Sequence, residues 1–354
     1  MKKYLLPENV NWYRANMHCH TTISDGNFTP EEVKEAYKAQ GYSIVAYTDH
    51  EILLDHSDLN DEDFLALTST EYSINEAEPT YPEKGNDFPV DPWQRKRVIH
   101  MNLFSKDPHN EFQPAAHDDT LWACGGKYKG LGKCDGYRRE YTLESINETI
   151  KRANEAGFLV QYNHPVWSLN DKDLYLNLKG LWSLEILNYA TERITGKEYC
   201  PYIYDEMVAN GMYNLLPTMG DDNHNRGRSL AHSFGGSTMI GAKELKYEQI
   251  IEAMEKGHVY STSGRENPPL IHSLYVEDNV IKVDCSPAVT VFLNGYARAY
   301  RIFEDADGKE ITHAEFPLDK NEVYFRITVR DKYGNNAHTG CYFVKDCMTD
   351  TDEN

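Results

Sequence analysis

Hydrophobic and polar positions follow one pattern up to about residue 265 of this 354-residue chain. Short apolar runs predict strands over 15–20, 42–50, 63–74, 97–105, 158–165, 180–188, 213–224 and 258–262. Helical periodicity with capping and stop residues predicts helices over 29–41, 142–157, 198–211 and 243–257. Because strands and helices alternate, this part is expected to form a parallel α/β domain, and seven or eight strands indicate a barrel.

A second pattern begins near residue 268, where short strands of alternating polarity are separated by turns such as "EDN" and "DADG". This pattern predicts a small all-β domain, an Ig-like sandwich. The predicted organisation is therefore a barrel over 1–265, a sandwich over 266–347 and a polar tail over 348–354. Within the barrel, the aperiodic region near 75–140 is expected to be an inserted loop region.

Charge and cysteine content narrow the possible partners. The net charge is −20, so binding of long duplex nucleic acid is disfavoured, because such binding depends on a basic surface. The scattered cysteines predict no disulfide framework; Cys124 and Cys134 could clip a loop or bind zinc, but free thiols are favoured. The amino-terminal residues resemble no signal peptide and no window is apolar enough to span a membrane, so a cytoplasmic location without membrane contact is expected.

Residues that can bind metal ions recur at or near the ends of the predicted strands. They are His18, His20, Asp25, His50, Glu71, His100, His164, Asp222 and His224. The carboxyl ends of parallel barrel strands share one face, so these side chains are expected to meet there. His18 and His20 point the same way on a strand, whereas Cys19 points away. A single His-x-His pair is more often a polar surface pair, but this recurrence predicts a zinc, manganese or iron site.

The ordered motifs "HCHTTISDG", "TDH", "NHP" and "GDDNH" resemble those of the polymerase and histidinol phosphatase (PHP) superfamily. The resemblance covers residues 16 to about 262. It implies a distorted (β/α)7 TIM-like barrel with a trinuclear metal centre that hydrolyses phosphoesters. It also implies two or three divalent cofactor ions and a metal-bridging hydroxide as the nucleophile.

The same resemblance divides the candidate ligands among three metal ions. The first set is His18, His20, Glu71 and Asp222; the second is His100 and His164, with Glu71 bridging; the third is Asp25, His50 and His224. Asp221 is an alternative to Asp222, although Asp222 stands two residues before His224 and is the better match.

Other residues are assigned supporting or catalytic roles. Asp49 is expected mainly to orient a neighbouring ligand, and Asp49 and His224 are the candidates for protonating the leaving alcohol. Glu185 and Asn188 are expected to support the ligands. Arg226 and Arg228 are candidate substrate-binding residues, with a solvated basic turn as the alternative.

Three further groups of residues are weaker candidates for a binding role. In the insert, the candidates for stacking a base or sugar are Trp93, Trp122, Tyr128, His109, His117, Arg138 and Arg139, although packing of the loop is favoured. Arg265 is a weaker phosphate-binding candidate. His272, His313 and His338 stand singly and are expected to be structural.

The sequence thus predicts a metal-dependent phosphoesterase that acts on a small phosphate ester or short nucleotide. Monoester and diester hydrolysis are not distinguished, and the oligomeric state is not indicated. The alternatives are a metal-dependent amidohydrolase, whose barrels also begin with His-x-His, and a non-catalytic metal-containing binding protein.

Overall fold

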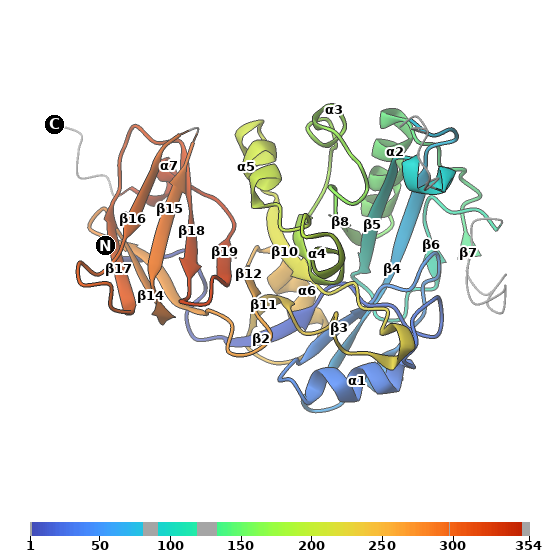
Figure 1. Cartoon of the computed structure of the whole chain (residues 1–354), viewed down its shortest axis with the longest axis horizontal. Helices are drawn as coiled ribbons and strands as arrows, with labels where there is room; N and C mark the ends of the chain where they lie inside the picture. The colour runs from blue at the N-terminus through green and yellow to red at the C-terminus, as the bar shows by residue number, and fades with distance from the viewer. Residues whose placement is uncertain (1, 81–90, 119–132, 297, 349–354) are drawn as a thin grey trace, which may run out of the picture.

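The computed structural model describes residues 2–80, 91–118, 133–296 and 298–348. A mixed sheet runs through most of the molecule (Figure 1), in the order β10-β9-β8-β5-β4-β3-β2-β11-β12-β19-β18-β15-β16. Its first part consists of β2 (Asn11–Asn16), β3 (Ile44–Tyr47), β4 (Leu65–Asn75), β5 (Val98–Ser105), β8 (Phe158–Tyr162), β9 (Ser183–Asn188), β10 (Leu216–Gly220), β11 (Gly236–Ala242) and β12 (Val259–Ser263). The predicted α/β class is confirmed.

The strand directions differ from those of a uniformly parallel sheet. Strands β2, β3 and β4 are parallel, as are β8, β9 and β10, but β5 between them runs antiparallel to both β4 and β8. Strand β11, which was not predicted from the sequence, pairs antiparallel with β2. Its sequence "GSTMIGA" lacks alternating polarity because the whole strand is buried.

The two ends of this first part of the sheet approach each other at β10 and β11. The Thr238 hydroxyl accepts a hydrogen bond from Met219 N at 3.1 Å and donates one to Met219 O at 3.0 Å. A Cβ atom at Gly236 would lie 2.6 Å from Gly220 O, so only glycine permits this approach. Side-chain bonds therefore join the two strands, and no ladder pairs them within the described residues.

Four predicted helices are present as α1 (Pro30–Lys38), α2 (Leu143–Glu155), α5 (Pro201–Ala209) and α6 (Tyr247–Glu255). Thr29 and Glu32 form a reciprocal capping box at the start of α1, and Val33 and Tyr37 are buried on its inner face. Each of these helices packs on a strand of the sheet: α1 on β3, α2 on β8, α5 on β9 and α6 on β11. The shorter α3 (Lys172–Tyr175) and α4 (Tyr189–Thr195) were not predicted.

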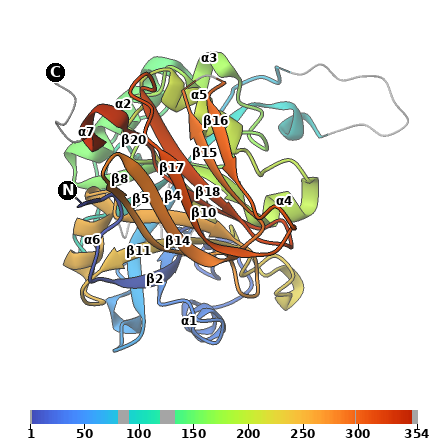
Figure 2. The same ribbon diagram turned by 90° about the vertical axis from the view of Figure 1, so that its left-hand side faces the viewer.

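The strands expected after residue 266 are also present. β13 (Ile271–Glu277), β14 (Val280–Ala288) and β17 (Ile311–Pro317) form a separate antiparallel sheet with β1 (Lys2–Tyr4). The other strands extend the large sheet: β15 (Thr290–Gly295), β16 (Tyr300–Phe303), β18 (Tyr324–Arg330), β19 (Asn336–Thr339) and β20 (Tyr342–Phe343). Figure 2 shows both layers, between which residues such as Leu274, Val283 and Ile327 are buried.

This carboxy-terminal region is joined to the rest of the chain by backbone and side-chain bonds. Strand β19 pairs with β12, so the sheet continues across residue 265. The Arg326 guanidinium donates to both Asp205 carboxylate oxygens, at 2.6 and 2.7 Å. His338, expected to be structural, is buried beside Arg326, and its Nε2 lies 2.7 Å from the Tyr199 hydroxyl.

Besides β5, which belongs to the large sheet, the described parts of the insert region contain β6 (Phe112–Gln113), β7 (Lys133–Cys134), the 3₁₀ turn η2 (Pro92–Arg95) and irregular connections. Cys134 is a free thiol. Trp122, Cys124 and Tyr128 lie outside the described residues. No helix in the described ranges is long and apolar enough to cross a membrane.

Candidate metal centre

The nine predicted ligands lie together at one end of the first part of the large sheet. Most follow strands or lie within them, as predicted, but the expected position at a carboxyl end is wrong for His100, which stands near the start of β5. Because β5 is antiparallel to β4, its start lies beside the end of β4, and His100 pairs with Ser73 in the ladder. His100 Nε2 lies 3.0 Å from Ser73 Oγ, and its Nδ1 lies 3.1 Å from Glu71 Oε1.

Glu71 occupies the middle of this cluster. Its Oε1 lies 3.2 Å from His18 Nε2 and 3.3 Å from His164 Nε2. Its Oε2 lies 3.4 Å from His20 Nε2 and 3.0 Å from His50 Nδ1. One buried carboxylate therefore faces imidazoles on several sides, the arrangement needed for a bridging ligand.

Three overlapping sets of side chains have ligand atoms within 4.8 Å of one another. The sets are His20, Asp25, His50 and His224; His18, Glu71 and His164; and His18, His20 and Asp222. His18 and His20 each belong to two sets, so cations held by these sets would be neighbours. The ligand roles themselves stay predictions.

Several polar atoms in the cluster are buried without a hydrogen-bond partner among the described residues. These atoms are His20 Nδ1, Asp25 Oδ1 and Asp222 Oδ1. Asp222 Oδ1 lies only 2.9 Å from His20 Nε2, yet the two groups are not aligned as a hydrogen bond. Buried polar atoms are nearly always partnered, so unsatisfied donor atoms that converge on one region fit a bound cation.

The protonation states of the ligands favour metal binding in part: nearby carboxylates outweigh burial and raise the pKa of His50 to about 9, so this imidazole must release a proton when a cation binds. Burial alone raises the pKa of Glu71, but His100 and other imidazoles hold this pKa well below its usual range. Burial likewise opposes ionisation of Asp222, but His18 and its neighbours hold its pKa well below normal. Burial and neighbouring imidazoles lower the pKa of His20 to about 4. At neutral pH the two carboxylates are ionised and His20 is neutral, as ligands must be.

Glu185 and Asn188 support the cluster from β9. Glu185 Oε1 lies 3.0 Å from His18 Nδ1, and Oε2 accepts hydrogen bonds from His164 N and Asn188 Nδ2 at 3.2 and 3.1 Å. Asn188 Nδ2 also donates to Asp222 Oδ2 at 3.0 Å. Such partners fix the tautomer and orientation of a ligating imidazole.

Two further supporting residues were not predicted from the sequence. Asn163 Nδ2 donates to Glu71 Oε1 and Asn102 Oδ1, both at 2.9 Å. Ser168 Oγ lies 3.1 Å from His164 Nδ1. Asn163 could have been predicted from its position beside His164 in "NHP". Ser168 reaches His164 through the turn that follows this motif, and no sequence pattern marks it as a partner of His164.

The choice between Asp221 and Asp222 is clear from their surroundings. The Asp221 carboxylate accepts hydrogen bonds from the backbone N–H groups of residues 234–236 and from the Tyr37 hydroxyl. It therefore holds the loop before β11, and Asp222 is the residue that faces the histidines. Asp222 and His164 have φ angles of 52° and 25°, a strained backbone of the kind found at functional sites.

Asp49 lies close to the cluster but is fully engaged elsewhere. Its carboxylate accepts hydrogen bonds from Thr21 N and Oγ1, both at 2.8 Å, and from Ser24 N and Oγ at 3.1 and 2.6 Å. These bonds brace the loop that carries Asp25. The geometry favours this orienting role over the proton-donor role predicted for Asp49.

The predicted substrate-binding arginines lie in the turn η4 (Arg226–Arg228). Arg228 pairs with Glu32 at 2.5 Å and its guanidinium lies 4.7 Å from the centre of the Phe28 ring. It is therefore engaged at the start of α1, which favours the surface alternative. Arg226 is exposed and has no ion pair with the described residues.

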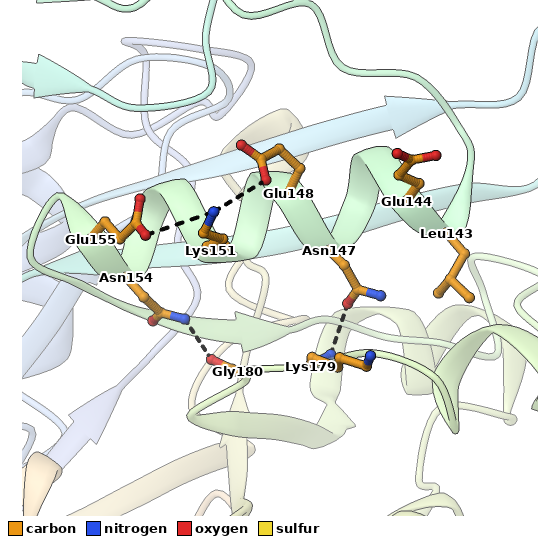
Figure 3. A pocket seen from close by; sticks show the side chains of 9 residues that line it. All are labelled: Leu143, Glu144, Asn147, Glu148, Lys151, Asn154, Glu155, Lys179 and Gly180. Carbon is orange, nitrogen blue, oxygen red and sulfur yellow. Dashed lines mark hydrogen bonds and ion pairs between the residues drawn. The ribbon is translucent and has the colours of Figure 1, made fainter.

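A separate pocket of about 660 Å³ lies along the outer face of α2 (Figure 3). Side chains of α2 bond to the backbone of residues 179 and 180: Asn147 Oδ1 accepts from Lys179 N, and Asn154 Nδ2 donates to Gly180 O, both at 2.8 Å. None of the candidate ligands lines this pocket. It is a surface groove distinct from the candidate metal centre.

No family model and no curated protein matches this sequence. Solved structures similar to it include a two-domain protein from Bacteroides vulgatus, described as containing a predicted PHP-like metal-dependent phosphoesterase. The similarity covers 92% of this chain and 93% of that one, at 12% identity and a TM-score of 0.43. A protein from Bifidobacterium adolescentis, provisionally named a metal-dependent phosphoesterase, is 18% identical over 60% of this chain and 88% of its own, with a TM-score of 0.35.

A third similar structure is an amidohydrolase from Chromobacterium violaceum with bound sulfate and no metal. It is 14% identical over 69% of this chain and 96% of its own, with a TM-score of 0.38.

Proposed function

We propose that this chain is a metal-dependent phosphoesterase and that its reaction takes place at the cluster around Glu71. The observation that carries the proposal is the overlap of the three ligand sets through His18 and His20. Overlapping sets place cations side by side, and adjacent cations suit a tetrahedral anion that offers several oxygens. A phosphate ester is such a group.

The residues that would hold two or three divalent ions, drawn from zinc, manganese and iron, are the nine of the cluster. When bound, such ions supply positive charge for phosphate oxygens and make a water molecule more acidic. The protein's own part is to fix the orientation of the ligands and to keep Glu71 and Asp222 ionised, because nearby imidazoles outweigh burial and hold the pKa of both carboxylates low. Glu185 orients His18, and Asn163 orients the Glu71 carboxylate.

Hydrolysis adds water across the P–O ester bond, and the departing alcohol takes a proton. Of the two residues predicted to provide that proton, His224 has the more suitable position. Its side chain is 19% exposed and its Nε2 lies 3.1 Å from Asp25 Oδ1, on the open side of the cluster. We assign His224 to this open side as a ligand or as the proton donor.

We further infer that the curved α/β sheet is a distorted (β/α)7 barrel that ends at residue 265, and that residues 266–347 form an Ig-like sandwich to which β1 adds a strand from the amino-terminal end. The contact of β10 with β11 supports closure of the barrel. The two facing layers with a shared apolar core support the sandwich.

The test is an assay of protein supplied with manganese, zinc or iron on three chromogenic substrates: p-nitrophenyl phosphate, bis-p-nitrophenyl phosphate and a p-nitroanilide. We expect metal-dependent release from a phosphate ester, abolished in Glu71→Ala and retained in His272→Ala, which alters an exposed histidine of β13. Release from the anilide alone would favour the amidohydrolase. Bound metal without any hydrolysis would favour a binding protein.

A further inference from the structure

Two tryptophans adjoin the metal centre and are called here the tryptophan corner: Trp93 of η2 and Trp167 of the segment after β8. The Trp167 ring lies 5.1 Å from the His164 ring and 5.6 Å from the His100 ring, measured between centroids. The Trp93 ring lies 5.9 Å from that of Trp167 at an interplanar angle of 60°. An aromatic surface thus begins at two candidate ligands and extends outward.

Both indoles of the corner are accessible to solvent. Trp93 is 50% exposed and Trp167 is 36% exposed. The sequence favoured a packing role for the aromatic residues of the insert, which include Trp93 but not Trp167, and packing alone would bury the Trp93 ring. Adjacent exposed tryptophans at a site are instead typical of a surface that binds an apolar group.

The corner is held in place by hydrogen bonds to its backbone. The buried Glu198 carboxylate accepts from Val166 N at 3.1 Å and from Trp167 N at 2.6 Å. On the other side, Asp91 Oδ1 accepts from Trp93 N at 2.9 Å. Preorganised exposed rings can bind a ligand without the cost of ordering them.

We propose that the tryptophan corner binds a planar aromatic ring on the alcohol portion of the substrate while the phosphate group faces the metal cluster. This proposal rests on the phosphoesterase function proposed above and specifies its substrate class as an aryl or nucleobase-bearing phosphate ester. A ring stacked on one indole face would meet the edge of the other, because the two planes are steeply inclined. Stacking of this kind accepts any flat ring.

The experiment compares wild type, Trp93→Ala and Tyr333→Ala, all supplied with metal. Trp93 is the residue to change because its ring contacts Trp167 and not a candidate ligand. Tyr333 provides the matched control, an aromatic residue that is 78% exposed in the turn before β19. The substrates are phenyl phosphate, adenosine monophosphate, glucose phosphate and methyl phosphate.

We expect kcat/KM of wild type to be at least tenfold higher for phenyl phosphate and adenosine monophosphate than for methyl phosphate. The Trp93→Ala change should reduce that ratio about tenfold, mainly through KM, whereas Tyr333→Ala should preserve it. Phenyl and adenosine esters together distinguish a general aryl site from one that prefers a nucleobase. Equal ratios in wild type and Trp93→Ala, or a preference for glucose phosphate alone, would overturn the proposal.

Calorimetric titration with phenylphosphonate and methylphosphonate gives a readout that needs no turnover. Tighter binding of phenylphosphonate that is lost in Trp93→Ala would support the corner even if no ester were hydrolysed, and the failure would then lie with the proposed reaction. Equal binding of the two phosphonates in wild type would overturn the aromatic subsite whether or not esters are hydrolysed.

Discussion

Glu185 Oε1 lies 3.0 Å from Nδ1 of His18, and both side chains are fully buried. The other ring nitrogen of His18 lies 3.2 Å from Glu71 Oε1, inside the cluster. The carboxylate on one side therefore fixes which nitrogen of His18 is presented to a cation on the other. A buried acidic residue of β9 thus acts on the metal centre without being in any of the three ligand sets.

This relationship makes Glu185→Gln an informative change. Glutamine preserves the size of the side chain but removes the charge that stabilises the Nδ1–H tautomer of His18. Loss of such a partner typically weakens metal binding by about 10–100-fold, and we expect that range here. Competition titration with a chromogenic chelator measures it. The control is Glu248→Gln, which alters an exposed residue of α6; equal affinities in the two variants would contradict the role of Glu185.

The overlap of the ligand sets predicts that substitutions of His20 and His50 reduce metal binding to different extents. His20 belongs to two sets, whereas His50 belongs to one. We therefore expect His20→Ala to lower the number of bound ions per chain more than His50→Ala does. Elemental analysis after loading and desalting measures this number. The same loss of metal in both variants, with their folds intact by circular dichroism, would show that the sets do not act as the geometry indicates.

Substitution of Asp221 should lower stability, whereas substitution of the adjacent Asp222 should lower metal binding. Asp221→Asn weakens bonds to several backbone N–H groups and the Tyr37 hydroxyl, and hydrogen bonds to charged groups contribute about 1.5–3 kcal/mol each. We expect it to lower the free energy of unfolding by about 2 kcal/mol or more. Asp222→Asn should instead reduce bound metal and hydrolysis. Urea denaturation of the metal-free proteins, with metal analysis, distinguishes the two, and exchanged outcomes would reverse the assignment.

Much of the fold could be predicted because local signals and tertiary structure agree. The threonine cap, proline and glutamates of α1 mark its start, and the apolar run of β3 marks a buried strand. The direction of β5 could not be predicted, since periodicity carries no information on whether neighbouring strands are parallel. Strand β11 was missed because a buried strand of small residues lacks alternation.

The candidate site was predictable where its residues form motifs. His18, His20 and Asp25 stand within one short segment, so their chemistry can be recognised from the order of residues alone. The supporting residues do not form such motifs. The Glu198 carboxylate stabilises the Trp167 segment by accepting a hydrogen bond from Trp167 N, 31 positions away in the sequence. No local pattern encodes such a contact, and the pairing of Trp93 with Trp167 depends in the same way on tertiary structure.

Stability should depend on pH through His338, which lies between the carboxy-terminal strands and the rest of the chain. Burial, together with the nearby Arg326 and Arg330, holds the pKa of His338 well below 6.5. The native state therefore keeps this imidazole neutral, with Nδ1 accepting a hydrogen bond from Arg326 and Nε2–H donating one to the Tyr199 hydroxyl. The unfolded chain takes up a proton below about pH 6.5. The contribution of His338 is fully present above that pH and declines as the pH falls towards the lowered native pKa.

We expect the free energy of unfolding of wild type to decline between pH 6.5 and 5 more steeply than that of His338→Gln, by up to about 1.4 kcal/mol per pH unit. The substitution itself lowers stability at neutral pH, so the slopes are compared and not the absolute values. Urea denaturation at closely spaced pH values supplies the slopes. His272→Gln, altering an exposed histidine, should keep the wild-type slope. Parallel slopes in wild type and His338→Gln would mean that this buried imidazole does not take up its proton on unfolding.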